Sequence, residues 1–220
     1  MALDTAQAGW QASTWELLVR LAANDGSATH RHVARLAAAD ASTRDLSDAV
    51  HAICAIHGHP PGLAGDAVGC AVQPAATDWL DAIASAFAGE RAWIAQLAAA
   101  AGPLPSTPGQ AETEAALIGE RHTLDMLARS DRMGCASGAA AALVLDWAAI
   151  RAILARAADR FAVAIPPCRL PIEAETATTV TMLASTQATE RAITFGAQQL
   201  LAQHRGLWSL LEARASAREA

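Results

Sequence analysis

The sequence contains no lysine and no tyrosine, and only three of its 220 residues are phenylalanine. Runs of valine, isoleucine and threonine, which are typical of strands, are also few, so the composition argues against a sheet protein. All 16 basic residues are arginines spread along the chain. We interpret this as a bias of genome composition. The net charge of -6 disfavours nucleic acid or an anionic membrane as a partner.

Closely spaced cysteine pairs are absent as well. Cys54, Cys70, Cys135 and Cys168 form no Cys-x-x-Cys motif, which favours free thiols in a reducing compartment. The N-terminal residues have neither the basic nor the apolar region of a secretion signal. The longest stretch without charge, residues 92–111, contains three prolines and is not expected to span a membrane. We therefore expect a soluble, cytoplasmic protein.

What the chain does have is alanine and helical periodicity, which predict an all-α fold. Apolar residues recur at helical spacing in three short and four long segments. These segments are residues 13–24, 27–39 and 42–58, and then 77–101, 110–132, 139–164 and 174–213. The expected architecture is an antiparallel bundle of four long helices with short N-terminal helices, ferritin-like or a similar up-down bundle.

The domain prediction follows from a segment rich in glycine, residues 63–76, which we expect to be a loop or one poor helical turn. It divides an N-terminal helical appendage (1–76) from the main bundle (77–213), and a polar tail (214–220) follows. Together they are expected to form one structural domain.

One pattern occurs twice, 30 positions apart: FAGERAWIAQL at residues 87–97 and LIGERHTLDML at residues 117–127. In each copy the glutamate, Glu90 or Glu120, lies in the middle of the apolar stripe of its helix. The glycine before each glutamate costs its helix about 1 kcal/mol relative to alanine. A repeated glycine in mid-helix indicates close contact with another helix, or with a second subunit in a homodimer.

Two further carboxylates occupy the same kind of position. Asp146 lies on the apolar stripe of the third long helix and Glu190 on that of the fourth. If short connectors make these helices antiparallel neighbours, all four carboxylates come to similar heights. The sequence therefore predicts one buried layer made of Glu90, Glu120, Asp146 and Glu190.

Buried carboxylates need partners, because an unpaired charge in the core costs several kcal/mol. One partner is iron or manganese, held by the four carboxylates with His57 as the nitrogen ligand. A second is arginine: Arg91, Arg121 and Arg191 each follow a glutamate directly, and each would pair with the glutamate of a neighbouring helix. A third is protonation with hydrogen bonds to neighbouring polar groups.

A ladder of polar residues precedes the bundle: Asp48, His51, Cys54 and His57 follow one another three positions apart. The ladder drifts around its helix, so the four side chains cannot meet at one ion. We expect Asp48 and His51 to face outward and His57 to face the core.

The ferritin-like template requires Glu-x-x-His on two helices, and this chain lacks it. Three positions after the four carboxylates stand Trp93, Thr123, Ala149 and Ile193. We therefore favour a structural polar network in a non-enzymatic helical protein that binds a ligand or a partner protein. The alternative is a carboxylate-bridged di-iron or di-manganese protein. The sequence leaves open whether the chain is an enzyme.

Overall fold

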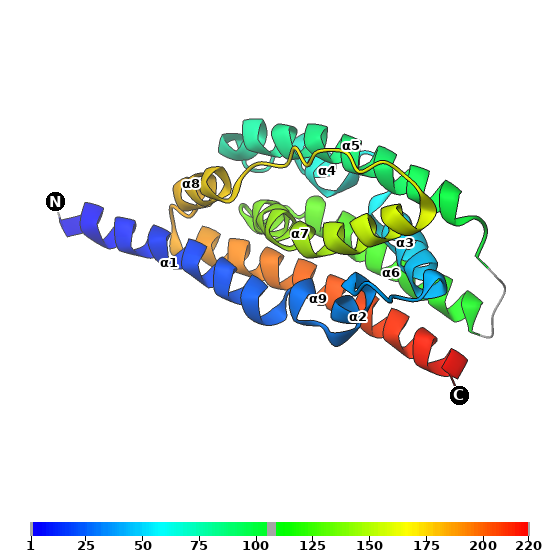
Figure 1. The fold of residues 1–220 in the computed structure, drawn as a ribbon. Coiled ribbons are helices and arrows are strands. Elements are labelled where there is room, and N and C mark those ends of the chain that lie inside the picture. Colours follow the sequence, from blue (N-terminus) through cyan, green and yellow to red (C-terminus); the bar gives the residue numbers. More distant parts are fainter. Residues whose placement is uncertain (1, 105–108, 220) are drawn as a thin grey trace.

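The computed structural model describes residues 2–104 and 109–219, with side chains described from residue 14 to residue 218 of those ranges. All elements in these ranges are helices (Figure 1). In chain order they are α1 (Ala2–Asp25), η1 (Ser27–Thr29), α2 (Arg31–Ala37), α3 (Thr43–His57), α4 (Gly62–Cys70), η2 (Pro74–Ala76), α5 (Thr77–Ala101), α6 (Gln110–Ala128), α7 (Cys135–Phe161), α8 (Glu173–Leu183) and α9 (Gln187–Glu219).

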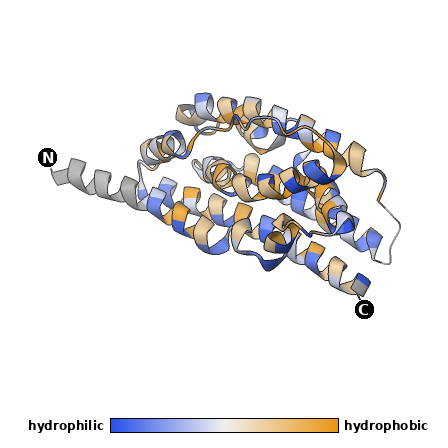
Figure 2. Ribbon diagram, in the orientation of Figure 1, coloured by the Kyte–Doolittle hydropathy of each residue, from blue (hydrophilic) through white to orange (hydrophobic). Residues whose placement is uncertain are grey.

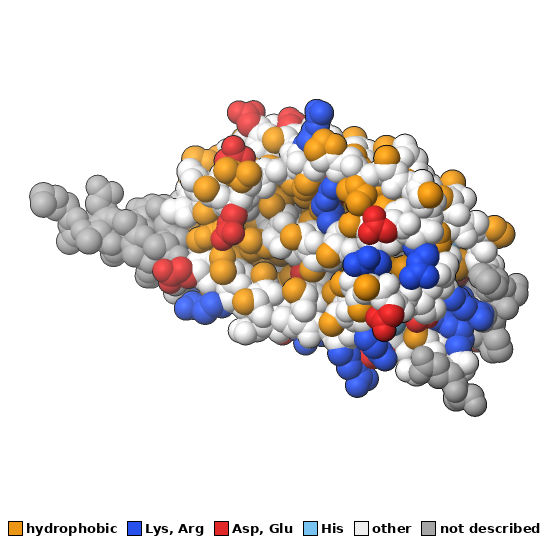
Figure 3. Space-filling model, viewed as in Figure 1, with side chains coloured by type: hydrophobic (Ala, Val, Ile, Leu, Met, Phe, Trp, Pro, Cys, Tyr) orange, Lys and Arg blue, Asp and Glu red, His pale blue; other side chains and the backbone are white. Residues whose placement is uncertain are grey.

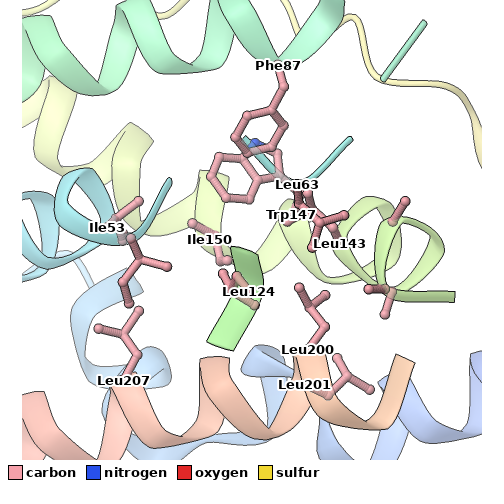
Figure 4. Packing of buried hydrophobic residues seen from close by; sticks show 14 of the residues in the cluster. Ile53, Leu63, Phe87, Leu124, Leu143, Trp147, Ile150, Leu200, Leu201 and Leu207 are labelled. Carbon is pink, nitrogen blue, oxygen red and sulfur yellow. The ribbon is translucent and has the colours of Figure 1, made fainter. Parts of the chain in front are cut away.

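Helix α7 is the central helix of the fold, and the other helices pack around it. Figure 1 shows α5 on one side of α7, and α1 and α9 side by side on the other. Residues 139–142 of α7 are alanines that are at most 1% exposed, and such small side chains let neighbouring helices approach closely. In Figure 4, Ile53, Phe87, Leu124 and Leu200 converge on this helix from α3, α5, α6 and α9.

Helices α7 and α9 approach each other closely where Gly138 and Gly196 lack the side chains that would hold the backbones apart. A Cβ atom on Gly138 would lie 1.9 Å from the carbonyl oxygen of Ile193, and one on Gly196 would lie 2.0 Å from that of Cys135. Neither helix can adopt this crossing with a larger residue at these positions. Gly89 and Gly119 are different, because a Cβ atom there would meet no atom of the described residues within 4 Å.

The prediction that Gly89 and Gly119 contact another helix is therefore wrong for helices of this chain. Contact with a second subunit stays a prediction. Several large apolar side chains remain exposed in the described part of the chain, among them Ile118 and Met126 on α6. On the face shown in Figure 3, hydrophobic atoms line a central hollow while acidic and basic side chains are interspersed around it.

The bounds of the long helices agree with the periodicity in three cases and differ in one. Helix α5 spans residues 77–101 as predicted, and α6 and α7 lie within a few residues of their predicted spans. The single helix predicted for residues 174–213 is two helices, α8 and α9. The chain restarts at Thr186, whose hydroxyl accepts a hydrogen bond from the amide of Thr189 at 3.1 Å, as an N-cap residue does.

The segment predicted to be a loop, residues 63–76, contains the nine-residue helix α4. Leu63, Ala64 and Ala67 of this helix are buried, and α4 packs against α5, α6 and α7. Its apolar residues lie at spacings of one, three and four, a helical stripe that its glycines obscured. The expected boundary between an appendage and the main bundle is therefore occupied by a helix of the core.

The predicted polar tail is the last part of α9, which continues to Glu219. Arg214 donates a hydrogen bond to Asp48 at 3.1 Å, and Arg218 contacts both Asp48 and Asp45. Asp48, which the sequence placed on the outer side of its helix, is consequently only 5% exposed. The end of α9 covers it, and the local pattern around Asp48 carries no sign of that contact.

Helix α7 is also the helix that, within the described residues, has the length and hydropathy to span a membrane. Its most hydrophobic window is 61% buried inside the protein, and a core helix passes the same test. Figure 2 shows hydrophobic residues along the other helices too, mixed with hydrophilic ones. The hydropathy of α7 therefore follows from its central place in the fold.

Candidate functional site

Two histidines and an aspartate from three helices form a buried chain. His57 is the last residue of α3, Asp146 lies in the middle of α7, and His204 lies on α9. The Nε2 atoms of His57 and His204 are 3.0 Å apart, and Nδ1 of His204 is 2.6 Å from a carboxylate oxygen of Asp146. The three residues are between 1% and 6% exposed. We call this set the Asp-His-His chain.

The far end of the chain is fixed by the turn that follows α1. The amide of Ser27 donates to Asp146 at 2.6 Å, the Ser27 hydroxyl donates to the same carboxylate, and the indole of Trp208 donates to that hydroxyl at 2.7 Å. A Cβ atom on Gly26 would lie 2.8 Å from the Asp146 carboxylate, so a glycine here lets the turn approach it. Asp146 therefore accepts three hydrogen bonds and is held in one orientation.

The same contacts set the charge of the chain. Burial raises the pKa of Asp146, but the hydrogen bond and charge of His204 and the two hydrogen bonds from Ser27 outweigh it, and the pKa lies below its ordinary value. Asp146 is therefore a carboxylate. The pKa of His57 lies well below 6.5, first because of its burial and second because of the charge of His204. His57 is therefore neutral near pH 7.

The near end of the chain opens into a small cavity. His57 forms part of the cavity wall together with apolar residues of α4, α5, α6 and α7, among them Leu63, Phe87, Leu124 and Leu143. The rings of Phe87 and Trp147 lie beside His57, with centroids 6.0 and 5.4 Å from the imidazole, and Figure 4 shows these two side chains together. The cavity is narrow, with a volume of about 30 Å³.

Two arginines line this cavity, and both belong to the repeated Gly-Glu-Arg pattern. Arg91 comes from α5 and Arg121 from α6. Neither forms an ion pair or hydrogen bond with any residue that the structure describes, although Asp125 lines the same cavity. Burial lowers the pKa of Arg91, which reflects the cost of removing its guanidinium from water without a counter-charge.

The rim of the cavity is the corner between α3 and α4, where His59, Pro61 and Gly62 lie. Gly62 begins α4 with a positive φ of 71°, and a Cβ atom there would be 3.0 Å from Nη1 of Arg91. A glycine suits this position for two reasons: it tolerates the left-handed backbone, and its lack of a side chain leaves space for the guanidinium of Arg91. The corner thus places Arg91 at the cavity.

The four predicted carboxylates have four different surroundings. Glu90, 2% exposed, accepts a hydrogen bond from the indole of Trp147 at 2.9 Å and pairs with Arg151 of α7. Arg151 also donates to the carbonyl of Pro166 at 2.5 Å and lies over the ring of Trp93. A glutamate–arginine pair between helices therefore exists as the sequence suggested, but its arginine is Arg151.

Glu120 and Glu190 are only partly buried. Glu120 lies close to α9, where a Cβ atom on Gly206 would be 3.1 Å from its Oε1 atom, and its Oε2 atom is buried without a hydrogen-bond partner in the described residues. Burial raises the pKa of Glu120 to about 7. Glu190 lies in the first turn of α9 beside an open hollow that Arg191 also lines. Arg191 forms no ion pair in the described part of the chain.

Among the side chains that the structure describes, residues 14–104 and 109–218, no group of three or more His, Cys, Asp or Glu is placed to hold a metal ion. Glu90, Glu120, Asp146 and Glu190 do not form such a group with His57. Of the predicted ligands, Asp146 and His57 belong to one assembly, and His204 links them. The spacing of residues in the sequence gave no sign that His204 contacts Asp146.

The sequence did not assign His204, Ser27 or Trp208 to a site with Asp146 and His57. His204 and Trp208 do fall on the inner stripe of the last helix, four positions apart, which puts them on one face. A polar residue on an inner stripe was the signal used for the carboxylates, and it would have marked His204 as well. Ser27 shows only the pattern of a helix cap.

Residues 22–219 match the sequence model of one protein family, described as a family of unknown function (DUF6975). No curated protein and no solved structure matches the chain. The match covers every residue of the Asp-His-His chain and both arginines of the cavity.

Proposed function

The chain belongs to this family of unknown function, and we propose that it is a helical binding protein whose cavity holds the carboxylate or phosphate group of a small anionic ligand. Arg91 and Arg121 are the anion-binding groups, and His57 is the wall of the cavity that meets the ligand. The proposal keeps the non-enzymatic binding function that the sequence favours and assigns it a position.

The observation that carries the proposal is a pair of arginines at one cavity that form no ion pair with a described residue, although one carboxylate, Asp125, lines the same cavity. Arg91 and Arg121 come from different helices and lack ion pairs in the described residues, whereas Arg151, Arg214 and Arg218 all contact carboxylates. Two guanidinium groups in a partly buried space repel each other and lose solvation, and an anion between them relieves both costs. Guanidinium groups also match the geometry of carboxylates and phosphates.

The size of the cavity limits the ligand. A volume of about 30 Å³ is room for one or two water-sized groups, far below the roughly 300–1,000 Å³ typical of a site for a drug-sized molecule. A single carboxylate or phosphate head fits this description, with the remainder of the molecule at the rim beside His59 and Pro61. The apolar walls favour a head group whose polar atoms are all directed at the arginines.

The net charge of the cavity supports an anion. Two arginines face one carboxylate, Asp125, and the buried His57 is neutral. The cavity therefore has a net charge of plus one, although the whole chain has a net charge of -6. This charge attracts an anion more strongly than a charge on the surface would, because a partly enclosed space screens it less than water does.

Isothermal titration of the full chain with inorganic phosphate, and separately with acetate, tests the proposal. Arg91→Gln and Arg121→Gln each remove one charged hydrogen-bond donor, worth about 1.5–3 kcal/mol, and should weaken binding by roughly 10- to 100-fold. Arg44→Gln is the matched control, because it removes the same charge at an exposed position on α3, outside the cavity. Binding by neither ion, or equal binding by all variants, would overturn the proposal.

A further inference from the structure

We infer that Asp146, His204 and His57 form a proton relay, in which Nδ1 of His57 takes a proton from the ligand in the cavity and the positive charge moves to His204. The inference rests on the proposed function and deepens it: the ligand is an anion that carries an acidic proton, such as a monoprotonated phosphate. His57 is the residue that meets this ligand, and His204 and Asp146 are positioning residues.

The hydrogen bonds of the chain leave two arrangements of protons. Asp146 is an acceptor, so Nδ1 of His204 carries a proton and donates it at 2.6 Å. The two Nε2 atoms, 3.0 Å apart, share one proton. In the first arrangement the shared proton is bonded to Nε2 of His57, both rings are neutral, and Nδ1 of His57 carries no proton. In the second the shared proton is bonded to Nε2 of His204, which is then an imidazolium, and the neutral His57 carries a proton on Nδ1.

The two arrangements differ by one proton, and the relay converts one into the other. The bond between the proton and a ligand atom breaks, its electron pair stays on the ligand, and the proton binds Nδ1 of His57. The proton on Nε2 of His57 passes at the same time to Nε2 of His204. The ligand has then lost one proton and the chain has gained one, and no other reactant is needed.

The surroundings of the two rings explain why the charge moves. His57 is enclosed by Phe87 and Trp147 and has no carboxylate partner in the described residues, so burial disfavours a charge on it. His204 differs, because its Nδ1 atom lies 2.6 Å from a carboxylate oxygen of Asp146, which places a counter-charge beside this ring. Proton uptake also converts a buried net charge of minus one into a neutral pair, and buried charges are most stable when paired.

Other titratable or charged groups face the relay from several helices. At the cavity end they are Arg91 on α5, Arg121 and Asp125 on α6, and His59 at the rim. Glu120 of α6 approaches α9 at Gly206, two residues from His204, and the Glu90–Arg151 pair is bonded to Trp147, whose ring lies beside His57. The turn of η1 contributes Ser27, which does not titrate in this range. The two arginines oppose proton uptake in the empty cavity, and a bound anion cancels their effect, so that uptake is coupled to binding.

The Ser27 hydroxyl is not a nucleophile in this arrangement. It lies at the closed end of the chain, where it donates to Asp146 and accepts from Trp208. The open end is His57, and its Nδ1 atom has no hydrogen-bond partner in the part of the chain that the structure describes. The relay therefore accepts a proton only from the cavity.

Nitrogen-15 labelling of the histidines in the full chain, read by long-range proton–nitrogen correlation spectra between about pH 4.5 and 8.5, tests the relay without any ligand. Lowering the pH should switch His57 from the tautomer protonated on Nε2 to the one protonated on Nδ1. His204 should become an imidazolium at the same midpoint. A His57 that becomes an imidazolium itself, or keeps one tautomer throughout, would overturn the relay.

Variants separate the relay from a merely structural role. Asp146→Asn removes the counter-charge and should lower the midpoint by about 1–3 pH units. Arg91→Gln should raise it in the empty cavity and keep the tautomer switch. An unchanged midpoint in Asp146→Asn would contradict the inference, and a variant that does not fold is replaced by Asp146→Glu, which should keep the switch.

Inorganic phosphate then connects the relay to the cavity. Phosphate should raise the midpoint by about one pH unit, because the proton on Nδ1 of His57 faces the bound anion. A tautomer switch that phosphate does not move, with phosphate bound by calorimetry, refutes the coupling but leaves the anion site standing. Absence of phosphate and acetate binding, with the switch intact, refutes the anion site and the ligand as the proton donor, but leaves the tautomer switch of the Asp-His-His chain standing.

Discussion

Glu120 makes the stability of the protein depend on pH in a direction opposite to that of most carboxylates. Its Oε2 atom is buried without a hydrogen-bond partner in the described residues, and burial raises its pKa from 4.5 to about 7. The unfolded chain ionises this group near its ordinary value. Between about pH 4.5 and pH 7 the unfolded state therefore loses a proton that the folded state keeps.

The folded state is consequently favoured below the unfolded pKa, and this contribution is lost as the pH rises to about 7. One pH unit of difference corresponds to about 1.4 kcal/mol, so the whole interval corresponds to about 3 kcal/mol. The side chain is partly open to water, which screens such effects, and we expect about 1–2 kcal/mol. Above pH 7 Glu120 is ionised in both the folded and the unfolded chain, and its contribution to stability is fully lost.

Glu120→Gln removes this titration and tests the reasoning. The variant should match the wild type near pH 4.5 and exceed its free energy of unfolding by about 1–2 kcal/mol at pH 8. Urea denaturation at four pH values between these limits measures the difference. Glu114→Gln, an exposed position on the same helix, is the control and should show no such trend. A difference between Glu120→Gln and wild type that stays constant with pH would contradict the burial of Glu120.

Two further predictions concern single contacts, and a third concerns bound metal. Gly196→Ala should destabilise the protein by about 3 kcal/mol or more in urea denaturation, because the new methyl group would overlap the carbonyl of Cys135; an unchanged midpoint would exclude the close α7–α9 contact. Asp48→Asn should cost about 3 kcal/mol, because it leaves Arg214 and Arg218 facing a neutral group, whereas the exposed Asp159→Asn should cost little. Elemental analysis of the purified chain should find iron and manganese well below one equivalent, with a melting temperature that chelator does not change; a full equivalent would restore the carboxylate-bridged metal site.

The periodicity of the sequence predicted the burial of the long helices well. On α5 the stripe that contains Leu80, Phe87, Glu90 and Leu97 is at most 5% exposed throughout. The same reasoning placed Asp146 on the buried face of α7, where it is 4% exposed. This succeeds because a helix fixes the direction of each side chain within its own few turns, and a stripe of one kind of residue must face the core.

The partners of these residues could not be predicted in the same way. Asp146 meets Ser27 and His204, which lie 119 and 58 positions away. Such contacts depend on which helices are neighbours and on how far each is shifted along its axis. The expected neighbours came from four long antiparallel helices. The short elements α4 and η1, predicted as a loop and as part of one helix, supply parts of the cavity and the site.

The geometry of the repeated Gly-Glu-Arg pattern explains why Glu90 and Glu120 do not share one carboxylate layer. Successive residues on a helix point about 100° apart, so a glutamate and the arginine after it face different neighbours. On α5, Glu90 faces α7 and Arg91 faces the cavity; on α6, Glu120 faces α9 and Arg121 faces the same cavity. The two copies therefore bring together their arginines and separate their glutamates, which is the reverse of a carboxylate cluster. The cavity receives one arginine from each copy and one carboxylate, Asp125, so a negative charge from outside the chain would balance it. This imbalance of charge is the physical basis of the proposed anion site.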